Sequence, residues 1–327
     1  MSCAVTVVAK EAAEAEKRVR NGWDAKWFVY ERPEALIVSE ATPTAAQVDY
    51  SKRPPQVSGG RGAALEASEE RAEPRAVGPM DVVHVRYRDA AGEVVPVLLC
   101  TPKGKTGPFP VVVAVHGLTS NKAQVCAQIG PELVERGFAV LAADMPRHGE
   151  RPGDPRSVLD KSNPIQAFTL FKQAVVNVRQ LIDLAEARPE LDTRGGVVLV
   201  GYSMGSWINS VVGPADERVR AMVLMVGGAH DLPPAALMIP QLAASDPRLA
   251  IAHFAGKPLL MVGAKRDYVV TPDMCERLFA AAAEPKEMVW YDCGHLLTAD
   301  AYEEAAEWVA QTVRSDVAPR DAAKSRR

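Results

Sequence analysis

Residues 197–205, with the sequence VVLVGYSMG, decide the fold of this chain. The first four residues form an apolar run of the kind found in strands buried on both faces. The next five follow the pattern G-x-S-x-G, and a short helix is expected directly after them. A serine hydroxyl is a weak nucleophile that must be aimed and deprotonated. A sharp turn between a strand and a helix aims the hydroxyl, and the flanking glycines let the two elements approach closely. We therefore predict that Ser203 is a nucleophile on such a turn.

Expected strands and helices alternate on both sides of this turn, from Asp81 to Arg314. Such alternation indicates a mostly parallel central sheet with helices on both faces. The first two strands, 82–87 and 94–99, are joined by a tight turn and should form an antiparallel edge hairpin. The other expected strands are 110–115, 138–143, 197–200, 219–226, 258–262 and 287–291, and the expected helices are 121–136, 164–187, 206–212, 272–283 and 301–314.

The remaining sequence divides into an extension, a cap and a tail. Residues 1–80 form an N-terminal extension, in which the Pro- and Gly-rich part 42–79 is expected to be a partly flexible linker. Residues 81–316 are the expected catalytic domain, and 317–327 a charged tail. The segment 229–256 between two expected strands is longer than an ordinary connection. We predict a small cap that lines an acyl pocket, the alternative being a plain crossover helix with an irregular loop.

Two local features of the extension also predict structure. Residues 36–38 favour a short strand. An aromatic cluster lies just before them, and we expect it to pack onto the main body of the protein. The cluster consists of Trp23, Trp27, Phe28 and Tyr30.

Composition excludes several classes of protein. The chain of 327 residues is 47% hydrophobic, too apolar for intrinsic disorder. Its net charge of −3 argues against nucleic acid as the main partner. The five cysteines are odd in number and form no C-x-x-C pair, which argues against a disulfide framework and a zinc site. The N-terminus lacks a basic region and no run of about 18 apolar residues occurs, so we expect a cytoplasmic protein without a membrane partner. The oligomeric state is not indicated.

From Asp81 to about Arg314 the chain resembles an α/β-hydrolase of the dienelactone hydrolase-like branch. Residues 111–118, VVVAVHGL, are similar to the third strand and oxyanion loop of that fold, and 138–149 to the next strand and its loop. The sequence ARPELD at 187–192 is typical of the branch. True dienelactone hydrolases use a cysteine nucleophile, whereas this chain has Ser203. The resemblance therefore implies an ester hydrolase. The first 80 residues do not share it.

In this fold the nucleophile, acid and histidine follow one another along the chain. His295 follows the last expected strand and is the predicted base. Asp267 follows the preceding strand and is the predicted acid, which orients the imidazole and stabilises its charged form. Asp231 is the rival acid. Asp292 is too near His295 in the chain to fold back easily.

The resemblance also implies the groups around the nucleophile. An oxyanion needs two backbone N–H groups in a dry pocket, and these would belong to Leu118 and Met204. His116 is expected to be a structural residue of the oxyanion loop. Asp144 and His148 are expected to brace the neighbouring loop. Lys122 is either part of the site or a charge on a helix surface.

Together these residues predict a serine carboxylester hydrolase that works through an acyl-enzyme, without cofactor or metal. The alternatives are a peptidase or amidase of the prolyl-oligopeptidase-like branch and a catalytically silent binding protein. The usual propeller domain of the former cannot form from 80 irregular residues, and an intact Ser, Asp and His set argues against the latter. The cap has small or medium side chains and is interrupted by Pro233, Pro234 and Pro240, so we expect a small-molecule ester with a short acyl chain.

Overall fold

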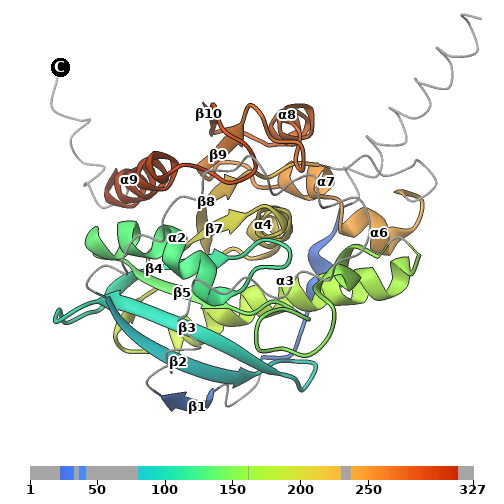
Figure 1. Ribbon diagram of the computed structural model, residues 1–327. Helices are drawn as coiled ribbons and strands as arrows, with labels where there is room; N and C mark the ends of the chain where they lie inside the picture. The colour runs from blue at the N-terminus through green and yellow to red at the C-terminus, as the bar shows by residue number, and fades with distance from the viewer. Residues whose placement is uncertain (1–22, 33–36, 42–79, 161, 230–236, 316–327) are drawn as a thin grey trace, which may run out of the picture.

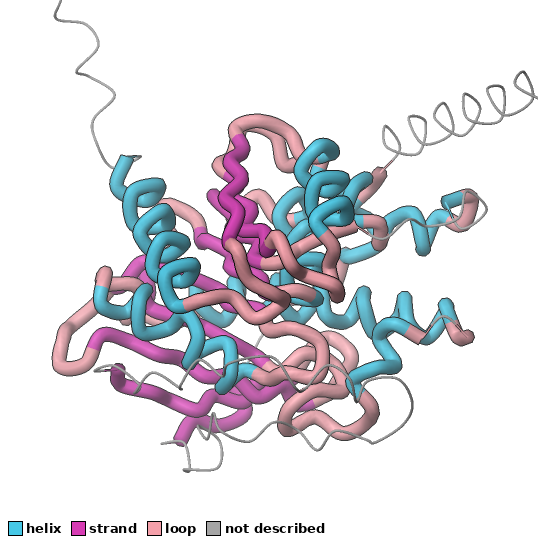
Figure 2. Tube along the Cα trace, turned by 45° about the horizontal axis from the view of Figure 1, so that its top comes forward, coloured by secondary structure: helices cyan, strands magenta, loops and turns pink. Residues whose placement is uncertain are grey.

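A ten-stranded sheet crosses the molecule and carries helices on both faces (Figures 1 and 2). The computed structural model describes residues 23–32, 37–41, 80–160, 162–229 and 237–315. The strands are β1 Ile37–Ala41, β2 Met80–Arg88, β3 Val94–Pro102, β4 Phe109–Val115, β5 Ala139–Ala143, β6 Leu191–Asp192, β7 Val197–Tyr202, β8 Val219–Met225, β9 Leu259–Ala264 and β10 Lys286–Tyr291. The α-helices are α2 Lys122–Glu135, α3 Pro164–Glu186, α4 Met204–Ala215, α6 Pro240–Ala244, α7 Pro247–Ile251, α8 Pro272–Ala281 and α9 Ala299–Ser315, and the 3₁₀ helices are η1 Ala25–Phe28 and η4 Pro155–Leu159.

The strand order is β1-β2-β3-β5-β4-β7-β8-β9-β10, with β6 paired to β4. The six strands from β5 to β10 along this order are parallel, while β1, β2 and β3 are antiparallel to their neighbours. The predicted hairpin is thus β2 and β3. The strand expected at 36–38 is β1, which pairs with the outer side of this hairpin. The chain order changes direction at β4, between β5 and β7, and such a switch point is where α/β sheets bind ligands at the carboxyl ends of their strands.

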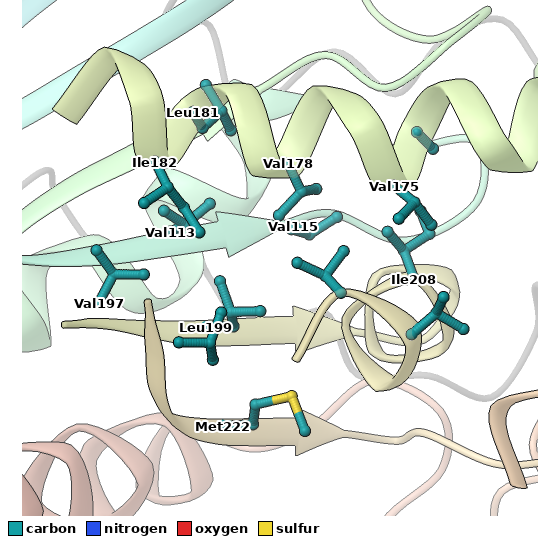
Figure 3. Close-up of a cluster of buried hydrophobic side chains, with 14 of the residues drawn as sticks. Val113, Val115, Val175, Val178, Leu181, Ile182, Val197, Leu199, Ile208 and Met222 are labelled. Atoms are coloured by element: carbon teal, nitrogen blue, oxygen red, sulfur yellow. The ribbon is translucent and has the colours of Figure 1, made fainter. Parts of the chain in front are cut away.

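Successive side chains of β4 enter opposite cores. Val111, Val113 and Val115 belong to the core covered by α3 and α4. Val112 and Ala114 belong to the core covered by α2 and α9. In Figure 3, valines, leucine and isoleucine of α3 point down onto β4 and β7. Because burying one such side chain contributes about 1.5–3 kcal/mol, these two layers hold the parallel strands and their carboxyl ends in place.

The helix after the serine is longer than predicted. The sequence pattern indicated a helix over 206–212, whereas α4 begins directly at Met204 and ends at Ala215. Ser203 is its N-cap residue, so the turn between strand and helix is confined to that one residue. Gly205 and Pro214 lower the helix propensity at the two ends, and packing against β7 and β8 overrides this preference.

The aromatic cluster packs onto the main body, beside α3 and α6 (Figure 1). Phe28 is fully buried, and its ring lies edge-on to Phe171 of α3. The Tyr30 hydroxyl donates a hydrogen bond to Asp183 Oδ2 at 2.6 Å. The N-terminal segment 23–32 is therefore part of the folded body. The expected linker 42–79 and the tail 317–327 lie outside the described residues.

Within the described residues, none of the helices is long and apolar enough to cross a membrane.

Candidate active site

Ser203 lies on a sharp turn at the carboxyl end of β7. Its φ of +53° and ψ of −111° are unusual for a residue with a side chain, and such backbone strain costs on the order of 1–3 kcal/mol. The Ser203 N–H donates to Met225 O of β8 at 2.9 Å, which holds the turn. The glycines beside it are required: a Cβ on Gly201 would lie 2.6 Å from the Gly205 carbonyl carbon, and one on Gly205 would lie 2.1 Å from Val115 O.

His295 bridges Ser203 and Asp267. It lies in the loop after β10, and its Nε2 is 3.0 Å from Ser203 Oγ. Its Nδ1 is 2.7 Å from Asp267 Oδ2. A carboxylate only accepts hydrogen bonds, so Nδ1 carries the proton that is donated to Asp267. Nε2 is then free to accept the hydroxyl proton of Ser203, which is the arrangement that activates a serine.

The Asp267 carboxylate is buried, with 1% of its side chain exposed. Oδ2 accepts from His295, while Oδ1 accepts from the N–H groups of Val269 at 2.8 Å and Val270 at 2.9 Å. These donors fix the carboxylate against the imidazole. The side chain of Asp292 is 75% exposed and forms an ion pair with Arg266 instead. The rival acid Asp231 lies outside the described residues.

The predicted oxyanion residues, Leu118 and Met204, belong to two segments that meet at Ser203. Met204 N is the first nitrogen of α4, where N–H groups have no partner within the helix and the helix dipole favours negative charge. Leu118 follows Gly117, and a Cβ on Gly117 would be 3.4 Å from Ser203 Cβ. The loops after β4 and β7 therefore meet at the nucleophile, as the predicted oxyanion residues require.

Two buried histidines brace the loops behind the site. His116 Nε2 accepts the Met145 N–H at 3.1 Å, so its Nδ1–H donates to Gly117 O at 2.8 Å. His148 lies with its ring 5.0 Å from that of His116 and bonds to Pro146 O through Nδ1 at 2.8 Å. Burial lowers the pKa of both rings, and that of His116 falls well below its usual range. Both rings thus bond to backbone groups of the loops after β4 and β5, which is the arrangement that the expected bracing role requires.

Lys122 is not a surface charge. Its side chain is 3% exposed, and Nζ donates to Asp144 Oδ2 at 2.8 Å and to Glu150 Oε1 at 2.6 Å. Asp144 also accepts from the N–H groups of Lys122 and Glu150, both at 2.9 Å. Gly149 is packed so closely that a Cβ would overlap the Asp144 carboxyl at 2.2 Å. This buried pair fixes the loop after β5 to the start of α2.

Sequence reasoning missed the role of Tyr202. Its hydroxyl donates to the His295 carbonyl at 2.5 Å and accepts the Leu297 N–H at 3.4 Å. Burial raises the pKa of the phenol, which therefore stays protonated as a donor. Tyr202, the residue directly before the nucleophile, thus holds the loop that contains His295. A large aromatic side chain at that position was the only signal in the sequence.

A small apolar pocket opens beside the first turn of α4. Among the described residues, all those that line it lie between positions 145 and 208 of the chain. None belongs to the predicted cap at 229–256, of which residues 230–236 are not described. The cap segment contains the short helices α6 and α7 and reaches the pocket indirectly, because Trp207 Nε1–H donates to Ser245 O at 2.8 Å. The lining residues are Met145, Pro146, Val158, Phe171, Ala174, Met204, Trp207 and Ile208.

No three His, Cys, Asp or Glu side chains in the described part of the chain gather as metal ligands would. Four cysteines there are buried free thiols, among which the sulfurs of Cys100 and Cys126 are 3.8 Å apart.

Comparison with known proteins gives the family and the fold. Residues 95–317 match the sequence model of the dienelactone hydrolase family. The fold is similar to that of an acetyl xylan esterase from Paenibacillus sp. R4, with a TM-score of 0.59 and 20% identity over 82% of this chain and 99% of that one. It is also similar to a cold-adapted esterase from an Arctic intertidal metagenomic library, with a TM-score of 0.57 and 19% identity over 75% of this chain and 99% of that one. No curated protein sequence matched. The predicted α/β-hydrolase fold is confirmed.

Proposed function

Since the chain belongs to the dienelactone hydrolase family and is a carboxylesterase-type hydrolase, we propose that it cleaves short-chain acyl esters with Ser203, His295 and Asp267 as its catalytic triad. The observation that carries this proposal is the unbroken line of hydrogen bonds from Ser203 Oγ through His295 to Asp267. An acid, an oriented imidazole and a strained, accessible hydroxyl are the parts that acyl transfer requires.

In the first half of the proposed reaction, Ser203 Oγ attacks the ester carbonyl while its proton passes to His295 Nε2. Asp267 stabilises the imidazolium that forms. The negative carbonyl oxygen is received by the N–H groups of Leu118 and Met204. As the tetrahedral intermediate collapses, His295 donates its Nε2 proton to the departing alcohol oxygen. Ser203 is left as an acyl ester.

The second half reverses these roles with water. His295 Nε2 takes a proton from the water as its oxygen attacks the acyl carbon. The same two N–H groups stabilise the second tetrahedral intermediate. His295 then returns the proton to Ser203 Oγ, and the carboxylic acid leaves. One ester and one water give one acid and one alcohol.

The small size of the apolar pocket, which has room for little more than a water-sized group, supports a short acyl group. Its wall includes Met204, the residue next to the nucleophile, and Trp207, one helical turn further on. Each buried CH₂ contributes about 0.8 kcal/mol only while the pocket has room for it. Bulky side chains from α3 and α4 close this pocket. We expect kcat/KM to peak at acyl chains of about two to six carbons and to fall beyond them.

We also propose the division of the chain and its location. Residues 81–316 are the proposed catalytic domain, with 1–80 as an extension and 317–327 as a tail, and the family match at 95–317 supports the central part. Free buried thiols are usual in reducing compartments, which supports the cytoplasm.

The test is a series of p-nitrophenyl esters of rising acyl length, together with a peptide amide. Ser203→Ala should lower kcat for the acetate about 10⁴-fold, with the circular dichroism spectrum unchanged. Ser210→Ala, the same change within the helix that follows Ser203, should keep activity within about twofold. Full activity in Ser203→Ala would disprove the nucleophile. Faster amide cleavage would favour the peptidase, and an inactive wild type would favour a binding protein.

A further inference from the structure

Two tryptophans from distant parts of the chain donate to neighbouring carbonyls at the end of α6. Trp23 Nε1–H donates to Ala244 O at 3.0 Å, and Trp207 Nε1–H donates to Ser245 O at 2.8 Å. The last carbonyl groups of a helix accept no hydrogen bond from within the helix. Ala244 and Ser245 are buried, so a carbonyl without a donor would be costly. The end of α6 is therefore held from two sides.

Trp207 is also a wall of the apolar pocket. Its ring lies 4.6 Å from that of Phe171 at an interplanar angle of 31°, and both rings line the pocket. The indole N–H of Trp207 is committed to Ser245 O. The position of the Trp207 ring in the pocket consequently depends on the position of the α6 end, and thus on Trp23.

The second aromatic wall rests on the same N-terminal segment. Phe28 is fully buried, and its ring meets Phe171 edge-on at 6.4 Å. The Trp23 ring stacks on His253, just after α7, with centroids 5.3 Å apart. Figure 1 shows this segment beside α3 and α6. Phe28 therefore supports the Phe171 wall directly, and Trp23 supports the Trp207 wall through the end of α6.

We infer that Trp23 and Phe28 are positioning residues that set the depth of the acyl pocket and so limit the length of acyl chain the enzyme accepts. Trp23 acts through the end of α6 on Trp207, and Phe28 acts directly on Phe171. Neither side chain lines the pocket. The inference rests on the proposed function and gives the N-terminal extension a part in its substrate selection.

The test is Trp23→Phe in the full chain. Phenylalanine keeps a ring to stack on His253 but has no N–H for Ala244 O. The readout is the ratio of kcat/KM for p-nitrophenyl hexanoate to that for the acetate. We expect the ratio to rise about fivefold, the change that corresponds to about 1 kcal/mol, with most of it in KM for the hexanoate. Trp27→Phe is the matched control, since Trp27 packs on Phe168, outside the pocket lining, and its ratio should stay within about twofold.

Phe28→Leu tests the support of the Phe171 wall, and it tests the inference on its own if the Trp23→Phe protein does not fold. It too should raise the ratio. A Trp23→Phe or Phe28→Leu protein that melts at a lower temperature but keeps the ratio of the Trp27→Phe protein would overturn the inference. Failure of the proposed function has a different signature: the Ser203→Ala protein would then hydrolyse the acetate as fast as the wild type.

Discussion

The hydroxyl of Tyr202 donates to the main-chain carbonyl of His295 at 2.5 Å. The residue before the nucleophile thereby holds the loop that carries the base. Their side-chain rings also meet edge-on, 5.9 Å apart. Ser203 and His295 come from strands separated by β8 and β9 in the sheet, so this contact couples two loops that backbone pairing alone leaves independent.

Tyr202→Phe should therefore reduce kcat while leaving KM for a small ester within about twofold. Losing this hydrogen bond, worth about 1 kcal/mol, should lower kcat for p-nitrophenyl acetate about fivefold. Tyr291→Phe is the control, because the Tyr291 hydroxyl donates to Glu304 on the exposed side of the molecule. Equal kinetics in the two variants would show that the Tyr202 hydroxyl does not position His295.

Replacing the acid separates the two candidates. Asp267→Asn presents an amide to His295 Nδ1 and favours the wrong tautomer, so kcat should fall about 10⁴-fold. Asp231→Asn should cost less than about tenfold. Asp292→Asn, on an exposed carboxylate three residues from the base, should be nearly neutral. Steady-state rates on p-nitrophenyl acetate compare the three, and a larger loss in Asp231→Asn than in Asp267→Asn would transfer the acid role to Asp231.

The buried histidines make stability depend on pH. Burial lowers the pKa of His116 and His148 in the folded protein from the value of 6.5 that histidine has when exposed. Below that value the unfolded chain binds protons that the folded one does not, so stability is complete above about pH 6.5 and falls as pH decreases. The limiting slope is about 1.4 kcal/mol per pH unit for each histidine.

Urea unfolding at several pH values between about 7 and 5.5 measures this slope. His148→Asn retains an N–H that can donate to Pro146 O but cannot titrate, and should flatten the curve. A wild-type free energy of unfolding that is constant over this range, or a slope unchanged in His148→Asn, would contradict the assignment of neutral histidines.

The buried ion pair of Lys122 and Asp144 should be costly to break. Lys122→Met leaves the Asp144 carboxylate buried without its cation and should destabilise the protein by about 3–5 kcal/mol. Lys26→Met removes a lysine from an exposed pair with Asp24 and should cost under about 1 kcal/mol. Denaturant unfolding gives both values. A second change, Asp144→Asn, should restore part of the loss in Lys122→Met, and similar losses in the two lysine variants would refute the argument.

The local sequence pattern was sufficient to predict the strands and turns on which the candidate catalytic residues lie. The apolar strand, the glycines around Ser203 and the strand positions before Asp267 and His295 are features of nearby residues, so the sequence predicts them. The pocket wall at Trp207 and the loop contact of Tyr202 are not of this kind. Each depends on which segments meet in space, and nothing in the sequence near Trp207 indicates that it donates to Ser245.

The burial of the charged side chain of Lys122 could not be predicted from the sequence either. Lys122 follows an N-cap asparagine at the start of α2, a position that is usually solvated. It becomes buried because Asp144 ends the neighbouring strand at the same edge of the sheet and accepts both of its nitrogens. Helix periodicity alone cannot show that a facing strand supplies a counter-ion.

Strand β1 bears on where this chain can be shortened. It pairs with β2 from Ile37 opposite Tyr87 to Ala41 opposite His84, and Glu40 forms an ion pair with Arg188. A polypeptide that begins near Met80 would leave the outer N–H and C=O groups of β2 unpaired, and such open edges recruit strands from other molecules. Expression of a chain that begins at Met80 should therefore favour self-association and insoluble protein, whereas a chain that begins before Trp23 keeps that edge protected.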